Sequence, residues 1–326
     1  MFRSPAKSQK KPRAIILANL GTPDAPDTPS LRKYLAQFLK DQRIVEIPRI
    51  AWWPILYGVI LTTRPAKSAK LYKNIWTEDG SPLLTGTVNL ASQLAKTSGE
   101  HVVAAMRYGS PSIDQVVKSL IDEGYEKLEI IPLYPQYSAT STASVYDAVF
   151  DVLKGERKVP AVNLVKDYFD HPGYITALAQ TVRKAIDERG QPDCLLVSFH
   201  GIPQRCVDLG DPYDEQCKIT TQLLVDELEL EPQQWELSFQ SRFGKAKWLT
   251  PATDQVLEEM PTQGMKNIMV ICPGFAIDCL ETLDEIDREA REIFMGSGGE
   301  NFYYIPALND SEEHALILQS LLTSPE

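Results

Sequence analysis

The sequence predicts an α/β fold of two similar doubly wound domains, each with a roughly four-stranded parallel sheet flanked by helices. Short β-branched runs alternate with helical patterns along the chain, as in parallel sheets covered on both faces. The 326 residues exceed one typical core. The strand-like runs also form two sets of about four, which favours two domains over one large sheet.

Each expected strand is a short apolar run followed by turn or polar residues. In chain order the strands are expected at 14–19, 102–106, 128–133, 162–165, 194–199, 235–241, 268–272 and 302–305. Helix candidates such as 175–188 and 214–228 separate them. We place the N-terminal Rossmann-like domain at 1–157 and the second at 158–307. A C-terminal helix at about 308–326 is expected to pack back on the first domain.

Composition indicates a folded cytoplasmic protein. Apolar residues make up 43% and charged residues 24%, which are ordinary globular values. A formal net charge of −11 disfavours nucleic acid as a partner, because phosphate binding needs an excess of Lys and Arg. Five cysteines without a CxxC pair fit reduced thiols. The basic start, residues 1–13, lacks an apolar core, so we expect a solvated tail rather than a signal peptide.

The longest apolar stretch, residues 50–61, is too short to span a bilayer. It contains Trp52, Trp53 and an interrupting Pro54, and basic residues flank it. Two interpretations stay open. The stretch is either a lip that covers a ligand or touches a membrane surface, or a buried core helix. The first interpretation predicts peripheral contact with the inner membrane.

Polar motifs follow several expected strands, where parallel sheets bind their ligands. They are Gly21-Thr22-Pro23, Arg107-Tyr108-Gly109 and Tyr134-Pro135-Gln136-Tyr137. Neither GxGxxG after the first strand nor GxxxxGK[ST] occurs, which disfavours a dehydrogenase or a kinase.

The sequence singles out His200 and Glu281. Of the four histidines, His200 is the one that ends an expected buried strand. Glu281 follows another such strand, and in a helix it would share one face with Asp278 and Glu285. An imidazole facing carboxylates suits a divalent metal or proton transfer. The competing interpretation of the carboxylates is a solvated helix start favoured by the helix dipole.

The stretch VSFHGIPQRCVDLGDPY resembles the signature of ferrochelatases of the bacterial type. Six further segments resemble that family in its own order: NLGTPDAP, IWTEDGSPL, MRYGSP, LYPQYSATSTAS, FQSRFGKAKWLTPATD and CPGFAIDCLETLDEI. The resemblance covers nearly the whole chain. It implies a chelatase-like fold and a lyase that inserts Fe²⁺ into protoporphyrin IX. Two protons are released and protoheme forms, the terminal step of heme biosynthesis.

The resemblance also assigns residues. His200 and Glu281 are implied as the catalytic and metal residues, and whether His200 chiefly ligates iron or accepts pyrrole protons stays open. Asp278 and Glu285 are expected to relay protons or metal. The porphyrin is expected to contact Leu20, Arg107, Tyr108, Tyr134, Tyr137, Trp248 and Phe275. Arg107, and secondarily Arg43, are expected to pair with the propionates.

Iron is expected as a substrate, with no cofactor required and no iron–sulfur cluster. The spacings of Cys206 and Cys217, and of Cys272 and Cys279, match no cluster pattern, and the cysteine-bearing extension of some relatives is missing.

Two positions depart from relatives. Cys279 replaces a histidine found in some of them. Leu20 stands where coproporphyrin-type relatives have a tyrosine, which favours protoporphyrin IX.

Two rival functions were weighed. A non-catalytic tetrapyrrole or metal carrier would need no proton acceptors, so His200 and Glu281 together disfavour it. Hydrolysis by Ser198 and His200 lacks a nucleophile-elbow motif.

Overall fold

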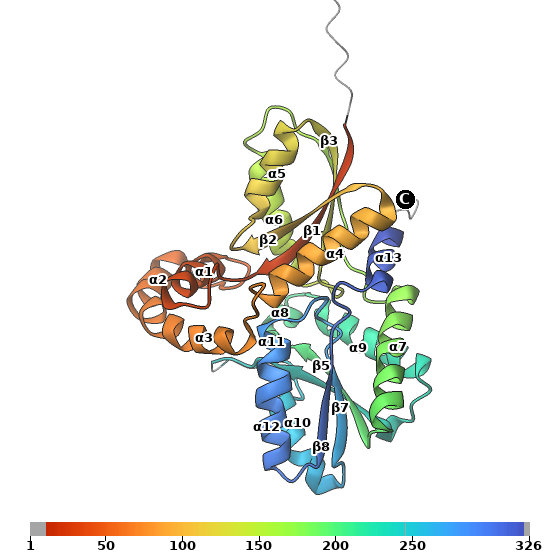
Figure 1. Ribbon diagram of the computed structural model, residues 1–326. Helices are drawn as coiled ribbons and strands as arrows, with labels where there is room; N and C mark the ends of the chain where they lie inside the picture. Colours follow the sequence, from red (N-terminus) through yellow and green to blue (C-terminus); the bar gives the residue numbers. More distant parts are fainter. Residues whose placement is uncertain (1–10, 245, 323–326) are drawn as a thin grey trace, which may run out of the picture.

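A computed structural model describes residues 11–244 and 246–322 of the chain (Figure 1). Most of the expected N-terminal tail, residues 1–10, lies outside that range. The described chain contains two four-stranded sheets in which all strands are parallel. The predicted fold class is therefore confirmed.

The two sheets share one topology. The first has the order β2-β1-β3-β4 and the second the order β6-β5-β7-β8, so each places its first strand between its second and third. The strands are β1 (Lys11–Gly21), β2 (His101–Tyr108), β3 (Tyr125–Pro132), β4 (Ala161–Leu164), β5 (Cys194–His200), β6 (Trp235–Gln240), β7 (Asn267–Ile271) and β8 (Asn301–Ile305). All eight overlap the segments expected from the apolar runs.

Alternation along each strand explains how the layers form. In β1, Ile15 and Leu17 face a core shared with α4 (Pro82–Ser98) and with α7 (Pro172–Arg189). Ile16 faces the opposite side, which α5 (Ile113–Asp122) and α6 (Thr142–Leu153) cover.

The second sheet repeats this arrangement. Val197 of β5 faces α7 and α9 (Tyr213–Glu227). Leu196 faces the side covered by α10 (Thr253–Glu259) and α12 (Arg291–Gly296). The core that contains Leu17 also contains Val197, so a single apolar cluster joins the two domains.

The expected domain boundary after residue 157 falls just before β4. β4 begins at Ala161 and pairs with β3, so the first sheet is completed only at Leu164. After β8 the chain returns in α13 (Glu312–Leu321), which packs against both α4 and α7. In Figure 1, α13 lies beside α4.

Between β1 and α4 the chain forms a helical extension that projects from the first domain (Figure 1). It comprises α1 (Thr28–Lys40), α2 (Arg49–Ile55), a π-helical turn (Leu56–Ile60) and α3 (Leu61–Ile75). The 50–61 stretch is partly buried and partly exposed, so it combines features of both interpretations that the sequence left open. Trp52 and Leu56 are buried, whereas Ile50 is 93% and Trp53 52% exposed. Within the described residues, every helix is too short or too polar to cross a bilayer.

Remaining short elements lie around the second sheet. They are α8 (Gln204–Asp208), 3₁₀ turns at Pro232–Gln234 and Met260–Gln263, α11 (Leu280–Leu283) and a π-helix (Glu285–Ala290) that continues into α12.

Gly21 is required where β1 ends. Its φ is +104°, and a Cβ atom there would lie 1.7 Å from the carbonyl oxygen of Tyr108 on neighbouring β2. Only glycine allows both the backbone angle and this close approach. The first strand of the sheet can therefore end directly beside the cavity described below.

Candidate active site

A largely apolar cavity lies between the two domains, at the carboxyl ends of their central strands. It encloses about 910 Å³ of empty space, part of which opens to solvent. The carboxyl ends of β1 and β5 and the segments after β3 and β7 supply much of its wall, including Leu20, His200, Tyr134 and Phe275. In each sheet these strands are neighbours whose connections leave in opposite directions, which is where open α/β sheets bind ligands.

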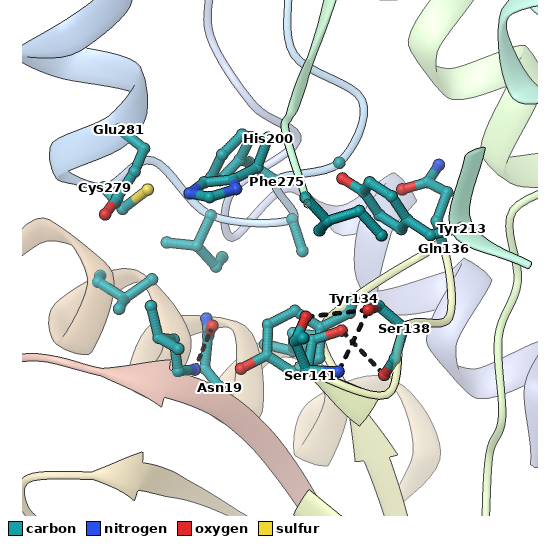
Figure 2. Close-up of a pocket in the computed structure, with 18 of the residues that line it drawn as sticks. Asn19, Tyr134, Gln136, Ser138, Ser141, His200, Tyr213, Phe275, Cys279 and Glu281 are labelled. Atoms are coloured by element: carbon teal, nitrogen blue, oxygen red, sulfur yellow. Dashed lines mark hydrogen bonds between the residues drawn. The ribbon is translucent and has the colours of Figure 1, made fainter. Parts of the chain in front are cut away.

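The cavity is a slot between two opposed walls. Figure 2 shows His200, Phe275, Cys279 and Glu281 along one side, and Asn19, Tyr134 and Ser141 along the other. The first group belongs to the second domain and the second group to the first. A flat ligand can therefore lie with one face against each domain.

His200 presents one ring nitrogen to the cavity with its lone pair available. Its Nδ1 lies 2.6 Å from the carbonyl oxygen of Gly201. A carbonyl oxygen only accepts hydrogen bonds, so Nδ1 carries the proton and Nε2 is the basic nitrogen. Gly201 permits this turn, because a Cβ there would lie 2.8 Å from the carbonyl oxygen of Gln240. The imidazole can thus accept a proton or bind a metal through Nε2.

Glu281 lies in the first turn of α11 and lines the same cavity. The amide Nε2 of Gln240 donates to its backbone oxygen at 2.7 Å, which fixes this turn against β6. The carboxylate also lies near the phenols of Tyr34 and Tyr72. Burial raises the pKa of both phenols, and the negative charge of Glu281 raises it further. His200 and Glu281 are thus brought together on one wall.

Asp278 lies outside the cavity lining. Its carboxylate accepts hydrogen bonds from Tyr304 Oη at 2.5 Å, Thr282 Oγ1 at 2.9 Å and Asn309 Nδ2 at 2.8 Å. Thr282 Oγ1 in turn accepts from the backbone N–H of Cys279 at 3.0 Å. These bonds hold the segment that carries Glu281, so the geometry gives Asp278 a supporting position.

Glu285 also lies behind the cavity lining, in the first turn of the π-helix. Its two carboxylate oxygens accept from the backbone N–H and the hydroxyl of Ser241, each at 2.6 Å. Burial raises the pKa of Glu285, and the charge of Glu281 acts in the same direction. The Ser241 bonds and the His200 charge oppose this. Glu285 therefore interacts electrostatically with both expected metal residues.

Arg107 and Tyr108 belong to a buried polar network behind the slot. The guanidinium of Arg107 contacts Asp41 Oδ2 at 2.6 Å and Ser144 Oγ at 2.7 Å. The Tyr108 hydroxyl donates to the same Asp41 oxygen at 2.7 Å. Arg107 thus already has a carboxylate partner. The expected second cation, Arg43, is likewise paired, with Asp147 at 2.7 Å.

Tyr137 and Trp248 do not line the slot either. Tyr137 faces a neighbouring polar cavity. The Trp248 indole N–H donates to the carbonyl oxygen of Phe243 at 2.7 Å. Its ring packs behind the His200 turn, where a Cβ on Gly201 would meet it at 3.4 Å. Of the seven expected porphyrin contacts, Leu20, Tyr134 and Phe275 line the slot.

Sequence reasoning missed several polar residues of the slot and one cation beside it. Asn19, Ser138, Thr140, Ser141 and Tyr213 line it. The cation is Arg64 of α3, one of the basic residues that flank the apolar stretch. Its guanidinium carbon lies 4.9 Å from the centre of the Phe243 ring. Burial lowers the pKa of Arg64, which Glu281 partly offsets, so its charge is close to the slot.

Across residues 11–244 and 246–322, no three His, Cys, Asp or Glu side chains converge closely enough to hold a metal ion. His200 and Glu281 offer two protein donors. A metal that completed its coordination with ring nitrogens of a bound substrate would need no more protein ligands than these.

Comparison with known proteins decides the family. The ferrochelatase family model matches residues 12–325. The chain belongs to the ferrochelatase family. It is 47% identical over 315 residues to the ferrochelatase of Yersinia pestis (strain Pestoides F), covering 96% of this chain and 98% of that relative. The ferrochelatase of Yersinia pseudotuberculosis serotype O:3 (strain YPIII) matches to the same extent.

Solved structures support the fold. SirB from Bacillus subtilis with Fe³⁺ aligns with a TM-score of 0.54 at 12% identity, over 95% of this chain and 94% of that chain. CbiX, the terminal enzyme of siroheme biosynthesis in denitrifying bacteria, aligns with a TM-score of 0.50 at 11% identity, over 95% and 97%. The two-domain chelatase architecture is thus shared with proteins of very different sequence.

Proposed function

We propose that this ferrochelatase-family protein inserts ferrous iron into protoporphyrin IX and releases two protons, giving protoheme in the terminal step of heme biosynthesis. The observation that carries the proposal is the slot itself. It pairs the basic Nε2 of His200 and the carboxylate of Glu281 on one wall with apolar contacts on the other.

The chemistry needs a base beside the ring face. Two pyrrole N–H protons must leave before the ring nitrogens can bind iron. The Nε2 atom of His200, whose Nδ1 is bound to the Gly201 carbonyl oxygen, is placed to take a proton. Glu281 can neutralise the imidazolium or bind the incoming cation. Glu285, whose raised pKa favours proton uptake, lies behind them and suits a relay role.

Apolar side chains suit the macrocycle. Tyr134 lies across the slot from Phe275 and His200, and Leu20 also lines it, so a planar ring would be held from both faces. Leu20 offers iron no oxygen ligand. We propose protoporphyrin IX in preference to coproporphyrin III on this ground. Turnover of the two porphyrins checks it, and faster turnover of coproporphyrin III would contradict it.

Arg64 is the better candidate for a propionate contact than Arg107. Arg107 is bound to Asp41, whereas the described partner of Arg64 is the ring of Phe243. A propionate would give the half-buried guanidinium a carboxylate partner.

Anaerobic mixing of protein, Fe²⁺ and protoporphyrin IX tests the function. The absorption bands of the free porphyrin should be replaced by those of heme at a rate proportional to the protein concentration. Glu281→Gln should retain porphyrin binding, measured by porphyrin fluorescence, and lose most of the insertion rate. Wild-type protein that binds porphyrin without converting it would support the carrier function instead.

We propose that iron passes through as substrate, with no organic cofactor and no iron–sulfur cluster. Among the described cysteines, Cys194, Cys217, Cys272 and Cys279 are buried and all five are free thiols. Purified protein with stoichiometric acid-labile sulfide would contradict the proposal.

We also propose a cytoplasmic protein that touches the inner membrane peripherally through residues 50–61. Exposed Ile50, Trp53, Tyr57 and Val59 gather on this extension, and an apolar surface with aromatic residues favours the lipid interface. In vesicle sedimentation, Trp53→Ser/Val59→Ser should weaken binding. Leu316→Ser, which removes an exposed apolar side chain on α13, is the control. If the two variants sediment with vesicles to the same extent, residues 50–61 are not the membrane contact.

A further inference from the structure

Part of one slot wall is a loop that also borders a second cavity. Residues Ser138, Thr140 and Ser141, in the loop between β3 and α6, line the slot from the first domain. A second, polar cavity encloses about 990 Å³ of empty space, part of which opens to solvent, and Thr140 lines both cavities. The loop therefore borders a cavity on each side, and hydrogen bonds help to hold its position.

A carboxylate of the second domain accepts two of those bonds. Asp211, between α8 and α9, accepts through Oδ2 from Ser138 Oγ at 2.9 Å and from the backbone N–H of Ala139 at 2.8 Å. Its Oδ1 accepts from the backbone N–H of Tyr213 at 3.1 Å. Ser138 and Tyr213 both line the slot. One side chain therefore ties together two wall segments that belong to different domains.

The neighbouring contacts between these segments are neutral. Gln136 Nε2 donates to Thr220 Oγ1 at 3.0 Å, and the backbone N–H of Tyr137 donates to Gln216 Oε1 at 2.6 Å. Hydrogen bonds to an ionised acceptor are roughly twice as strong as neutral ones. The hydrogen bonds that Asp211 accepts are therefore expected to be the strongest of these interdomain contacts.

We propose that Asp211 is a positioning residue that fixes the separation of the slot walls and thereby the affinity for the porphyrin. It acts through Ser138, Ala139 and Tyr213 and does not itself line the slot. Without it, the loop can shift toward the polar cavity and the ring is held less firmly. The inference rests on the proposed function, because it assumes that a porphyrin occupies the slot.

The test is Asp211→Asn, which keeps the size of the side chain and removes its charge. Loss of charge-assisted bonds should raise the porphyrin KM about tenfold. The porphyrin Kd, measured by fluorescence, should rise in parallel. The KM for ferrous iron should stay unchanged, because His200 and Glu281 are untouched. Ser138→Ala removes one of the bonds and should raise the porphyrin KM about threefold. Combined, the two changes should raise it by less than the product of the single effects.

Asp193→Asn is the matched control. The Asp193 carboxylate also accepts two backbone N–H groups, from Lys266 and Asn267, but it precedes β5 at the end of the sheet remote from the slot. This variant should lose stability and keep the porphyrin KM.

If Asp211→Asn and Ser138→Ala both lose stability while their porphyrin KM stays within twofold of wild type, Asp211 has no positioning role. Should Asp211→Asn fail to fold, Ser138→Ala alone decides by the same criterion. Failure of the proposed function would appear separately, as a wild type that binds porphyrin and forms no heme.

Discussion

Replacing Arg107 by methionine should damage stability and spare porphyrin binding. The Arg107 side chain is 22% exposed and that of its partner Asp41 only 6%. Breaking a buried ion pair from one side costs about 3–5 kcal/mol. Asp41 keeps hydrogen bonds from Ser144 Oγ, Tyr108 Oη and the backbone N–H of Arg43. We therefore expect Arg107→Met to lower the free energy of unfolding by about 3 kcal/mol, the low end of that range.

The length of the chain determines how far this loss of stability lowers the melting temperature, Tm. With an unfolding entropy of about 2.1 cal/mol/K per residue, 3 kcal/mol lowers the Tm of a chain this long by about 4 °C. Calorimetry measures that shift, and porphyrin fluorescence measures the Kd of the same sample.

Arg64→Met is the matched comparison, because it removes an arginine placed beside the slot. It should raise the porphyrin Kd about tenfold, as expected for the loss of a charged hydrogen bond, and leave the Tm nearly unchanged. The reverse pattern, in which Arg107→Met keeps its Tm and loses porphyrin affinity, would refute the assignment of Arg107 to the buried network.

Three further predictions concern stability, geometry and proton transfer. Burial alone would raise the pKa of Asp41, but hydrogen bonds from Ser144, Tyr108 and Arg43 and the Arg107 charge outweigh it and lower the pKa. The stability that ionised Asp41 contributes is thus complete above about pH 5 and is lost as the pH falls through the lowered pKa. In urea titrations the gap between wild type and Asp41→Asn should shrink over that range, and a gap that does not depend on pH would contradict this. Gly21→Ala should lower stability by more than about 3 kcal/mol, because the new Cβ meets the Tyr108 carbonyl; a variant as stable as wild type would show that β1 can shift. Glu285→Gln should slow insertion about tenfold or more at saturating porphyrin and iron while the porphyrin Kd stays the same, as expected for loss of a proton relay; an unchanged kcat would remove that role.

The fold was predictable because it depends on local patterns. The apolar runs at 14–19 and 194–199 mark the central strands β1 and β5, and both form strands that are largely buried. The boundary was harder to place. β4 is a four-residue strand with no fully buried side chain, so its membership of the first sheet is decided by pairing with β3 rather than by its own composition.

The position of a site residue could be predicted where a chemically active side chain stands at or just after the end of a buried strand. His200 ends β5 and faces the slot, and Glu281 follows β7 on the same wall. Arg107 also lies near a strand end, but its guanidinium forms an ion pair with Asp41, which is 66 residues away in the sequence. Spacing along the chain carries no information about such a partner. The same holds for Arg64, which lies beside the slot because α3 packs against α11.

The spacing of residues along the sequence also could not predict the π-helix at Glu285–Ala290. An expected α-helix would align Asp278, Glu281 and Glu285 on one face. In the structure, Asp278 precedes α11 and is held by Tyr304 and Asn309, while Glu285 is held by Ser241. Tertiary hydrogen bonds, rather than helical periodicity, decide where each carboxylate lies.

The proposed function rests on a coupling between metal insertion in the slot and proton removal at His200. Its most direct measurement is the ratio of protons released to heme formed, followed with a pH indicator in weakly buffered anaerobic solution, for wild type and for His200→Ala. The wild type should release two protons for each heme. The variant should bind porphyrin with an unchanged Kd and release protons and form heme together at no more than about a hundredth of the wild-type rate. A His200→Ala protein that inserts iron at the wild-type rate would contradict the claim.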